Sequence, residues 1–354
     1  MNLTLGLNTM SPTVNFGPWG SGPAPTMKMV KRAEALGYDT VWTSEASGTD
    51  AVSPIAYIAG QTSTIKVGTN IMQMAGRSPA TTAMTAVTLD SLSNGRFVLG
   101  LGVSGPAVVE GWHSQPYGKP ISRSREYITI VREIVARKRP LEFHGEYFDI
   151  PYQGEGATGL ARPIKLMVRP RRPRIPLYLA AIGPNNVRLA LEMCDGILPP
   201  VYSPYKEKVF FAEQADQTTI DAQRQDQGLG PIQLAPFVPV IVGDDVDKCI
   251  DKMRPTIAFW LGAMGPKTMN FYNRMACRFG YEKEATEIQE LYWEGKRSDA
   301  AALVPVELAD EISLCGPRER IRDRLDAWRE SLVTQLIVTA SDEPALTTLA
   351  ELIL

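Results

Sequence analysis

Residues 65–105 read IKVGTNIMQMAGRSPATTAMTAVTLDSLSNGRFVLGLGVSG, and this stretch decides the fold class. Its pattern predicts a strand over 65–73, a helix that ends at Asn94-Gly95, and a second strand over 97–104. The helix begins at Ser78-Pro79, because Ser is a favoured helix cap and Pro fits the first helical position. Two strands joined by one crossover helix run parallel, so the stretch predicts a βαβ unit.

The same alternation extends in both directions along the chain. Eight apolar runs are typical of strands, and nearly all of them precede a helix-like segment: 3–8, 40–45, 65–73, 97–104, 176–181, 195–201, 233–244 and 334–340. We therefore predict an α/β fold, a (β/α)8 TIM barrel that forms a single domain over residues 1–354. An open doubly wound sheet is the alternative, because it alternates strands and helices in the same way.

Two segments interrupt this rhythm. Residues 139–174 are rich in Gly, Pro and Arg, and we interpret them as an insertion on the barrel rim after strand 4. Residues 264–304 form a helical excursion after strand 7, which would cover the pocket, form a subunit interface or simply pack into the core. The first insertion carries six basic residues and no acid over 162–174, suited either to anionic ligands or to a solvated loop; they are Arg162, Lys165, Arg169, Arg171, Arg172 and Arg174.

The composition excludes several classes of protein. Lys and Arg number 37 against 39 Asp and Glu, so there is no basic excess for nucleic acid or an anionic membrane. No apolar run approaches the roughly 18–20 residues of a membrane helix. The first residues have no positive region of the kind that opens a signal peptide, and four isolated cysteines are typical of reduced core residues. We expect a cytoplasmic protein with a small-molecule substrate.

Histidine is scarce, which limits the chemistry that side chains alone could perform. His113 and His144 are the only imidazoles, and no Cys or His pair has zinc-ligand spacing, so we expect no metal site. The G-x-S-x-G motif of a hydrolase nucleophile is also absent. The reactive atom is therefore expected to belong to a bound cofactor.

Two glycine clusters follow predicted strands. Gly100-Leu-Gly102-Val-Ser-Gly105 matches the dinucleotide motif G-x-G-x-x-G, but three strand–helix units precede it and no clear helix opens at Gly105. A strand end where a cofactor approaches the backbone, or a mere bend in the strand, are the other interpretations. The second cluster, 180–186, opens a helix. Its free N–H groups can hold a phosphate, or the cluster is simply an ordinary Gly-Pro-Asn helix cap.

Polar residues at other strand ends complete the candidates. Glu45 follows strand 2, Asn70 and Ile71 lie within strand 3, and Ser104 follows strand 4. In a barrel these ends meet at one mouth, where active sites lie, although each polar group can also be an ordinary hydrogen-bonded core residue. His113 and Tyr117 lie in a loop after strand 4 that is suited to holding a ring or a phosphate, whereas His144 is typical of a surface histidine.

Residues 67–113 and 175–199 together resemble the bacterial-luciferase-like monooxygenase superfamily, and most closely its branch that uses the deazaflavin coenzyme F420. The resemblance implies a cofactor across the carboxyl-terminal mouth of the barrel and a cis peptide at Asn70-Ile71 beneath its ring. It also implies that the phosphate contacts fall after strands 4 and 5. The implied cofactor-binding residues are Asn70, Ile71, Gly102, Ser104, Gly105, His113, Tyr117, Ala181, Ile182, Gly183 and Pro184.

The resemblance implies an oxidoreductase that transfers a hydride between F420 and a small organic substrate. Glu45 is the first candidate for the proton role, because desolvation at the mouth would favour its neutral form, and His113 is the second. The Asp-His pair and the Glu of the branch's sugar-phosphate dehydrogenases are replaced here by Glu45-Ala46 and Gly105-Pro106. An FMN-dependent monooxygenase and a non-catalytic flavin-binding relative are the alternatives. We also expect a homo-oligomer, a dimer or higher.

Overall fold

The computed structural model describes residues 3–9, 22–211, 217–226, 228–340 and 342–354. Thirteen strands are assigned in these ranges: β1 (Thr4–Asn8), β2 (Thr40–Thr43), β3 (Lys66–Thr69), β4 (Met72–Gln73), β5 (Phe97–Gly102), β6 (Phe143–His144), β7 (Asp149–Ile150), β8 (Leu177–Ala180), β9 (Gly196–Leu198), β10 (Gln233–Leu234), β11 (Phe237–Val242), β12 (Leu314–Gly316) and β13 (Gln335–Ala340). All but β6 and β7 belong to one large sheet.

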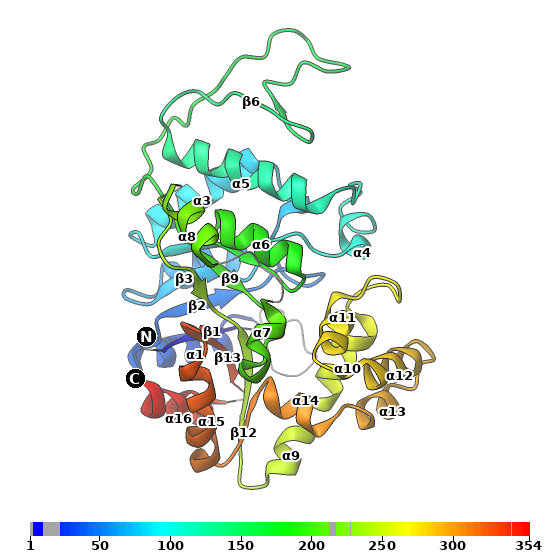
Figure 1. Ribbon diagram of the computed structural model, residues 1–354. Coiled ribbons are helices and arrows are strands. Elements are labelled where there is room, and N and C mark those ends of the chain that lie inside the picture. Colours follow the sequence, from blue (N-terminus) through cyan, green and yellow to red (C-terminus); the bar gives the residue numbers. More distant parts are fainter. Residues whose placement is uncertain (1–2, 10–21, 212–216, 227, 341) are drawn as a thin grey trace.

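Helices connect and surround these strands (Figure 1). In the first half they are α1 (Ala24–Ala35), α2 (Val52–Ala59), η2 (Met74–Gly76), α3 (Pro79–Leu92), α4 (Pro106–Val109), α5 (Pro120–Ala136) and α6 (Pro184–Met193). In the second half they are η3 (Pro204–Lys206), α7 (Glu207–Phe210), α8 (Gln217–Asp226), α9 (Val246–Asp251), α10 (Arg254–Ala263), α11 (Phe271–Arg278), α12 (Glu282–Trp293), α13 (Arg297–Ala302), α14 (Val306–Glu311), α15 (Arg318–Glu330) and α16 (Glu343–Ile353).

The large sheet is parallel and curled. Its strand order is β10-β9-β8-β5-β3-β2-β1-β13-β11-β12, and β4 pairs with β5 beside β3. Residues 233–242 reach both sides of the curl: β10 pairs with β9, whereas β11 pairs with β13. The backbone N–H of Thr334 also donates to the carbonyl of Leu234 at 2.9 Å, which joins β10 to the start of β13. The predicted parallel α/β architecture is therefore confirmed.

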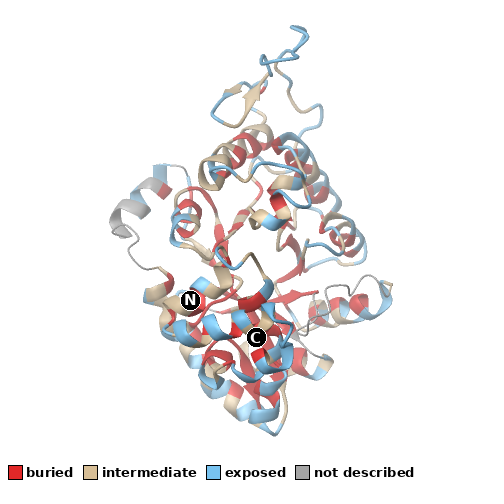
Figure 2. Ribbon diagram, turned by 90° about the vertical axis from the view of Figure 1, so that its right-hand side faces the viewer, coloured by how far each residue is buried: buried red, intermediate tan, exposed pale blue. Residues whose placement is uncertain are grey.

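The hydrophobic core has two parts. The larger part lies between the outer face of the sheet and the surrounding helices (Figure 2). It contains most of the buried aliphatic side chains, from strands and helices alike. The smaller part lies within the curl and is built by residues of five different strand regions: Trp42, Val98, Leu198, Ala235 and Ile337. A sheet buried on both faces explains why its strands are nearly continuous apolar runs in the sequence.

Several local expectations differ from the structure. The strand expected over 65–73 is divided at Asn70-Ile71, and the strand expected over 233–244 is divided at Pro236, which has no N–H for a ladder. The expected helix over 245–261 is two helices, α9 and α10. The strand β12 was not anticipated, because three residues are too few for a periodic signal.

Two expected helix starts also need correction. Ser53 does not cap α2; the Asp50 carboxylate does so, accepting from the backbone N–H groups of Val52 and Ser53 at 2.8 and 2.7 Å. A short helix, α4, does open after Gly105, although no clear helix was expected there. The helix expected near 204–226 corresponds to η3, α7 and α8, with 212–216 outside the described residues.

Residues 139–174 extend away from the helices and the sheet, above α5 in Figure 1. Within them β6 and β7 form a small antiparallel pair. The end of this segment returns to the amino-terminal side of the sheet. There Arg172 donates to the Asp90 carboxylate and to the carbonyl of Phe97 at 2.7 Å, and Arg174 donates to Asp195 at 2.9 Å.

These contacts correct the interpretation of the basic stretch over 162–174. The carboxylates that Arg172 and Arg174 bind belong to the chain itself: Asp90 lies near the end of α3, and Asp195 lies just before β9. These ion pairs favour a structural role for the two residues over a role in holding an anionic ligand. Separately, none of the described helices combines the length and the apolar content that crossing a bilayer requires.

Candidate active site

The candidate residues gather at the carboxyl-terminal edge of the parallel sheet. Glu45 follows β2, Asn70 and Ile71 follow β3, Ser104 and Gly105 follow β5, and residues 181–184 follow β8. Because β2, β3, β5 and β8 are consecutive neighbours and run in one direction, these loops share one edge. In α/β folds this is the edge at which ligands bind.

A backbone bulge lies between β3 and β5. The peptide bond between Asn70 and Ile71 is cis, as the resemblance implies. A β-carbon added to Gly102 would lie 2.6 Å from Cδ1 of Ile71, so the glycine is required where the Ile71 side chain lies. Gly100 is tighter still, since a β-carbon there would meet the carbonyl oxygen of Thr69 at 1.8 Å. The two glycines therefore serve close packing between neighbouring strands.

The turn after β5 leaves open space on its surface. Ser104 has a φ of 64°, in the left-handed region, and turns the chain toward α4. Gly105 is the residue before α4, and a β-carbon added to it would meet no atom of the described residues within 4 Å. Packing within the protein therefore does not require a glycine at position 105. A glycine here instead leaves room for a bound group.

The start of α6 has the same character. Gly183 precedes the helix without a capping side chain, Pro184 is the first helical residue, and a β-carbon on Gly183 would also meet nothing within 4 Å. Ala181 just before it is buried, while Ile182 packs partly against the core. The buried Oδ1 atom of Asn186 has no hydrogen-bond partner among the described residues. Unpaired helix N–H groups and an unsatisfied amide are suited to holding a phosphate.

Glu45 is held by an ion pair with Arg77, which follows η2. The Nη1 atom of Arg77 lies 2.9 Å from both carboxylate oxygens, and the two side chains are only 10% and 16% exposed. The guanidinium thus fixes the position of the Glu45 carboxylate at the edge of the sheet. The backbone carbonyl of Glu45 accepts a hydrogen bond from Nε2 of Gln73 at 3.3 Å.

His113 joins the same group of residues through Gln73. Its Nε2 atom lies 2.5 Å from Oε1 of Gln73, and its ring lies against Gly76. Tyr117 lies four residues after His113, and its backbone N–H donates to the Glu110 carboxylate at 3.3 Å. Partial burial raises the pKa of the Tyr117 hydroxyl above its ordinary value. The structure thus brings Glu45 and His113 into one network.

Gln73 and Arg77, which connect this network, were missed by the sequence reasoning. Both lie in the quoted stretch, between the predicted strand and the helix that begins at Ser78-Pro79. For Gln73 the available sequence signal was a polar residue within an apolar run, and the structure shows that its side chain is buried. His144, in contrast, is a surface residue as expected, and its Nδ1 lies 2.6 Å from Oδ1 of Asp149.

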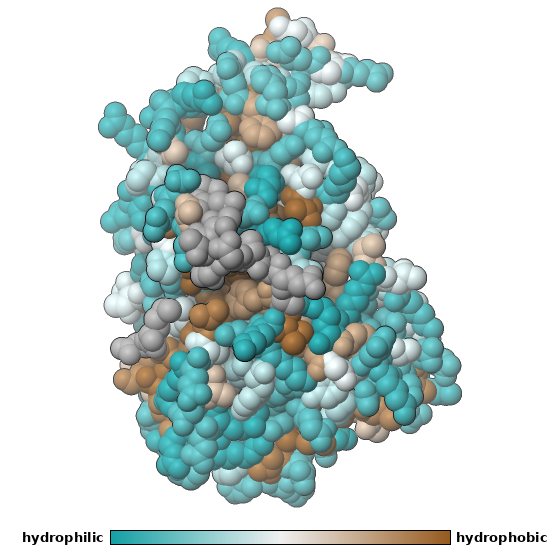
Figure 3. Space-filling model, in the orientation of Figure 1, coloured by the Kyte–Doolittle hydropathy of each residue, from teal (hydrophilic) through white to brown (hydrophobic). Residues whose placement is uncertain are grey.

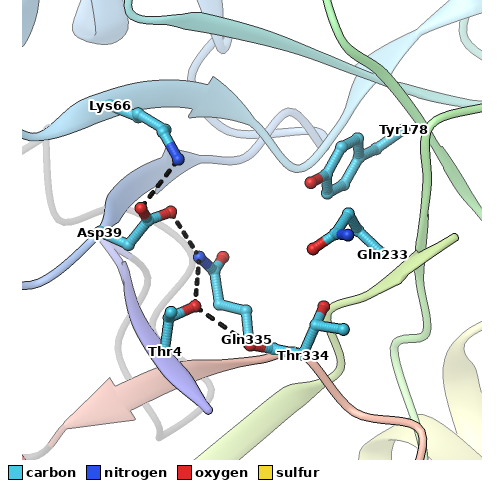
Figure 4. Close-up of a pocket in the computed structure, with 7 residues that line it drawn as sticks. All are labelled: Thr4, Asp39, Lys66, Tyr178, Gln233, Thr334 and Gln335. Carbon is cyan, nitrogen blue, oxygen red and sulfur yellow. Dashed lines mark hydrogen bonds and ion pairs between the residues drawn. The ribbon is translucent and has the colours of Figure 1, made fainter. Parts of the chain in front are cut away.

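A cavity of about 310 Å³ lies at the opposite edge of the sheet (Figure 4). Its walls come from the beginnings of strands, and Lys66 there pairs with Asp39 at 2.8 Å while Gln335 donates to the same carboxylate at 3.0 Å. Tyr178 and Gln233 face them from the other side. This cavity is separate from the candidate site. In the described part of the chain, no group of three or more His, Cys, Asp and Glu side chains is placed to hold a metal.

With this geometry established, comparison with known proteins identifies the class. The model of the luciferase-like monooxygenase family matches residues 7–335, so the chain belongs to that family of enzymes, as the resemblance predicted. A Mycobacterium tuberculosis protein named "Putative coenzyme F420-dependent oxidoreductase" is 38% identical over 343 residues, which is 96% of this chain and 98% of that protein. A 5,10-methylenetetrahydromethanopterin reductase of Archaeoglobus fulgidus is 27% identical over 309 residues, covering 87% of each chain.

Solved structures confirm the fold. The coenzyme F420-dependent tetrahydromethanopterin reductase of Methanopyrus kandleri superposes with a TM-score of 0.76 at 22% identity, covering 100% of this chain and 99% of that one. An F420-dependent secondary alcohol dehydrogenase, solved with an F420-acetone adduct, gives a TM-score of 0.73 at 18% identity, covering 100% and 98%. At such identities these likenesses concern the fold alone.

Proposed function

We propose that the protein is an F420-dependent oxidoreductase that transfers a hydride between the deazaflavin and a small organic substrate. The observation that carries the proposal is the pair of open glycines, Gly105 and Gly183, beside the bulge at Asn70-Ile71 on one edge of the sheet. The 38% identity to a relative named for F420 dependence favours this cofactor over FMN. In full, we propose a (β/α)8 barrel with insertions after strands 4 and 7.

The residues present fit a phosphorylated cofactor. Ser104, Gly105 and the N-terminus of α6 at Gly183 and Pro184 would hold its phosphates, with Ala181 and Ile182 lining the approach. Asn70, Ile71 and Gly102 would support its ring, and His113 and Tyr117 would lie beside it. When bound, the deazaflavin supplies a carbon that accepts or gives a hydride. The chain then has to orient the substrate, exclude water and move a proton.

His113 and Glu45 are the groups proposed for the proton. Arg77 holds both carboxylate oxygens of Glu45, so this residue would act on the proton from a fixed position. The imidazole of His113 has one ring nitrogen bound to Gln73 and a second that could exchange a proton with a substrate. Both residues belong to the network through Gln73, so a change at one is expected to affect the other.

Equilibrium binding of each cofactor to the apoprotein tests the proposal. We expect F420 to bind and FMN to bind much more weakly, measured by fluorescence titration of the full chain. A matched pair of variants, Gly183→Val and Gly230→Val, separates the site from general damage, because a β-carbon on Gly230 also meets no described atom within 4 Å and Gly230 lies before β10, away from the site. Tight FMN binding without F420 binding would overturn the choice, and oxygen consumption with a partner reductase would then identify a monooxygenase.

We further propose that the protein forms a homo-oligomer through the projecting segment 139–174. This segment exposes large apolar side chains, with Met167 96% exposed and Leu160 and Ile164 similarly uncovered. Figure 3 shows apolar atoms at the tip of the segment, at the top of the view. Light scattering would give a multiple of the chain mass of 38.9 kDa, and Met167→Glu with Ile164→Glu would lower it. A monomeric wild-type chain would refute this assembly.

A further inference from the structure

We propose that Gln73 is a positioning residue that fixes the tautomer of His113, with the ring proton on Nε2 and the free lone pair on Nδ1. The inference rests on the proposed function for its catalytic meaning, but the tautomer itself is a property of the protein alone. It deepens the proposal because it names the atom that exchanges the proton.

The orientation of the Gln73 amide follows from its two partners. Its nitrogen donates to the backbone carbonyl of Glu45 at 3.3 Å, and a carbonyl oxygen can only accept. The amide oxygen therefore faces His113, whose Nε2 lies 2.5 Å away. An amide oxygen also only accepts, so Nε2 has to carry a hydrogen. Gln73 is 4% exposed, and water has little access to compete for these bonds.

Glu45 completes the support for this orientation. Its side chain is bound by Arg77, so the residue is held at the place where its carbonyl meets the Gln73 amide. The ring of His113 is held from another side, because a β-carbon on Gly76 would lie 3.0 Å from Cε1 of the imidazole. Glu45, Gln73 and Gly76 therefore determine the orientation of the His113 ring.

The chemistry of the neutral ring then assigns the reactive atom. With hydrogen on Nε2, Nδ1 holds the lone pair, and it has no hydrogen-bond partner among the residues that the structure describes. A substrate O–H or N–H bond breaks as a new N–H bond forms at Nδ1, and the ring becomes a cation without gaining or losing electrons. In the reverse direction Nδ1–H returns the proton. The Nε2–H bond to Gln73 persists in both forms.

The second histidine provides a control within the same chain. Nδ1 of His144 lies 2.6 Å from the carboxylate of Asp149, and a carboxylate is an acceptor. When its ring is neutral, His144 is therefore expected to carry its hydrogen on Nδ1. The two histidines of this protein are predicted to be opposite tautomers, and His144→Asn assigns their signals.

Long-range proton–nitrogen correlation spectra of the nitrogen-15-labelled apoprotein test the inference, recorded at about pH 8, above the ordinary imidazole range. We expect His113 to give the Nε2–H pattern in the wild type and in Gln73→Glu, whose carboxylate also accepts. Gln73→Leu removes the acceptor, so its His113 signals should shift toward a mixture of tautomers while the His144 pattern stays unchanged. An Nδ1–H pattern for wild-type His113, or no change in Gln73→Leu, would overturn the inference.

Turnover gives an independent readout of the catalytic meaning. With F420 and an accepted substrate, Gln73→Leu should lower kcat by about tenfold with little change in KM, because only part of His113 would then present a free Nδ1. Gln73→Glu should restore much of the loss. If the chain does not use F420 at all, the proposed function fails while the spectra still decide the tautomer. If Gln73→Leu does not fold, Gln73→Met supplies the same comparison, because its thioether is a far weaker acceptor than the amide oxygen.

Discussion

The Nη1 atom of Arg77 lies 2.9 Å from each of the two carboxylate oxygens of Glu45. Both residues stand at the carboxyl-terminal edge of the sheet, Glu45 after β2 and Arg77 after η2. The pair is largely buried, so each charge depends on the other for the interactions that water would otherwise supply. This relationship fixes the Glu45 carboxylate in place beside the network that supports His113.

Replacing Glu45 by Gln should lower turnover more than it lowers cofactor binding. The amide cannot accept a proton, and we expect kcat to fall by about 100-fold, within the usual range for one acid–base group. The measurement is steady-state kinetics with F420 across the pH range. Arg77→Lys, which retains a positive charge, is the control and should lose less. Full turnover with an unchanged pH profile in Glu45→Gln would remove Glu45 from the proton role.

Alanine at Gly102 and at Gly105 should have different consequences. At Gly102 the new methyl group would lie 2.6 Å from Ile71, so the bulge has to move, at a cost of about 1–3 kcal/mol in the free energy of unfolding. At Gly105 it meets nothing within 4 Å, so stability should hold while F420 binds more weakly. Denaturant unfolding and cofactor titration of both variants would reveal this contrast. Equal cofactor affinity in Gly105→Ala and wild type would contradict it.

Arg172→Met should destabilise the protein without weakening cofactor binding. Asp90 is 1% exposed, and removing its guanidinium partner leaves a buried charge unpaired, which costs about 3 kcal/mol. The exposed Arg169 is the matched control, and Arg169→Met should change stability by less than about 0.5 kcal/mol. Thermal unfolding and F420 titration separate the two effects. A loss of F420 affinity in Arg172→Met would contradict this expectation and show that Arg172 contributes to cofactor binding.

Glu34 should contribute stability that depends on pH. Partial burial alone would raise its pKa, but backbone N–H groups of Thr64, Ser63 and Ile65 hold the pKa below the ordinary value of 4.5. A lowered folded-state pKa stabilises the protein above the ordinary value, and this contribution disappears as the pH falls through the lowered one. Glu34→Gln should therefore cost about 1 kcal/mol at neutral pH and less below about pH 4.

Unfolding of wild type and Glu34→Gln in denaturant, measured at several pH values, checks this expectation. Glu290→Gln serves as the control, since Glu290 is exposed and its replacement should be nearly neutral at every pH. A difference between wild type and Glu34→Gln that grows toward acid would have the wrong sign and would contradict the assignment.

Sequence reasoning succeeded where a pattern is local. Ser78-Pro79 starts α3 as expected, with the Ser78 hydroxyl accepting from the N–H of Thr81, because a helix cap involves only neighbouring residues. The parallel sheet followed from alternation of strands and helices. The positions of Glu45, Ser104 and Gly183 on one edge followed in turn from the direction of the strands.

The rest depended on contacts between residues distant in sequence. Nothing near Arg172 indicates that its partner is Asp90, 82 positions away, so its place in a basic stretch suggested a ligand instead. Gln73 and Arg77 gained meaning only when the folded chain placed them between Glu45 and His113. Tertiary structure determines such pairings, and periodicity carries no information about them.

The pairing of β1 with β13 also determines when this protein can fold during synthesis. Thr4 bonds to Thr334, 330 residues further along, and β1 has no second neighbour until that late stretch leaves the ribosome. Until then an unpaired edge of β1 is exposed, and such edges promote aggregation. Closure of the sheet around β1 therefore waits for the last tenth of the chain, so a truncation that removes β13 should leave the remaining protein prone to aggregation.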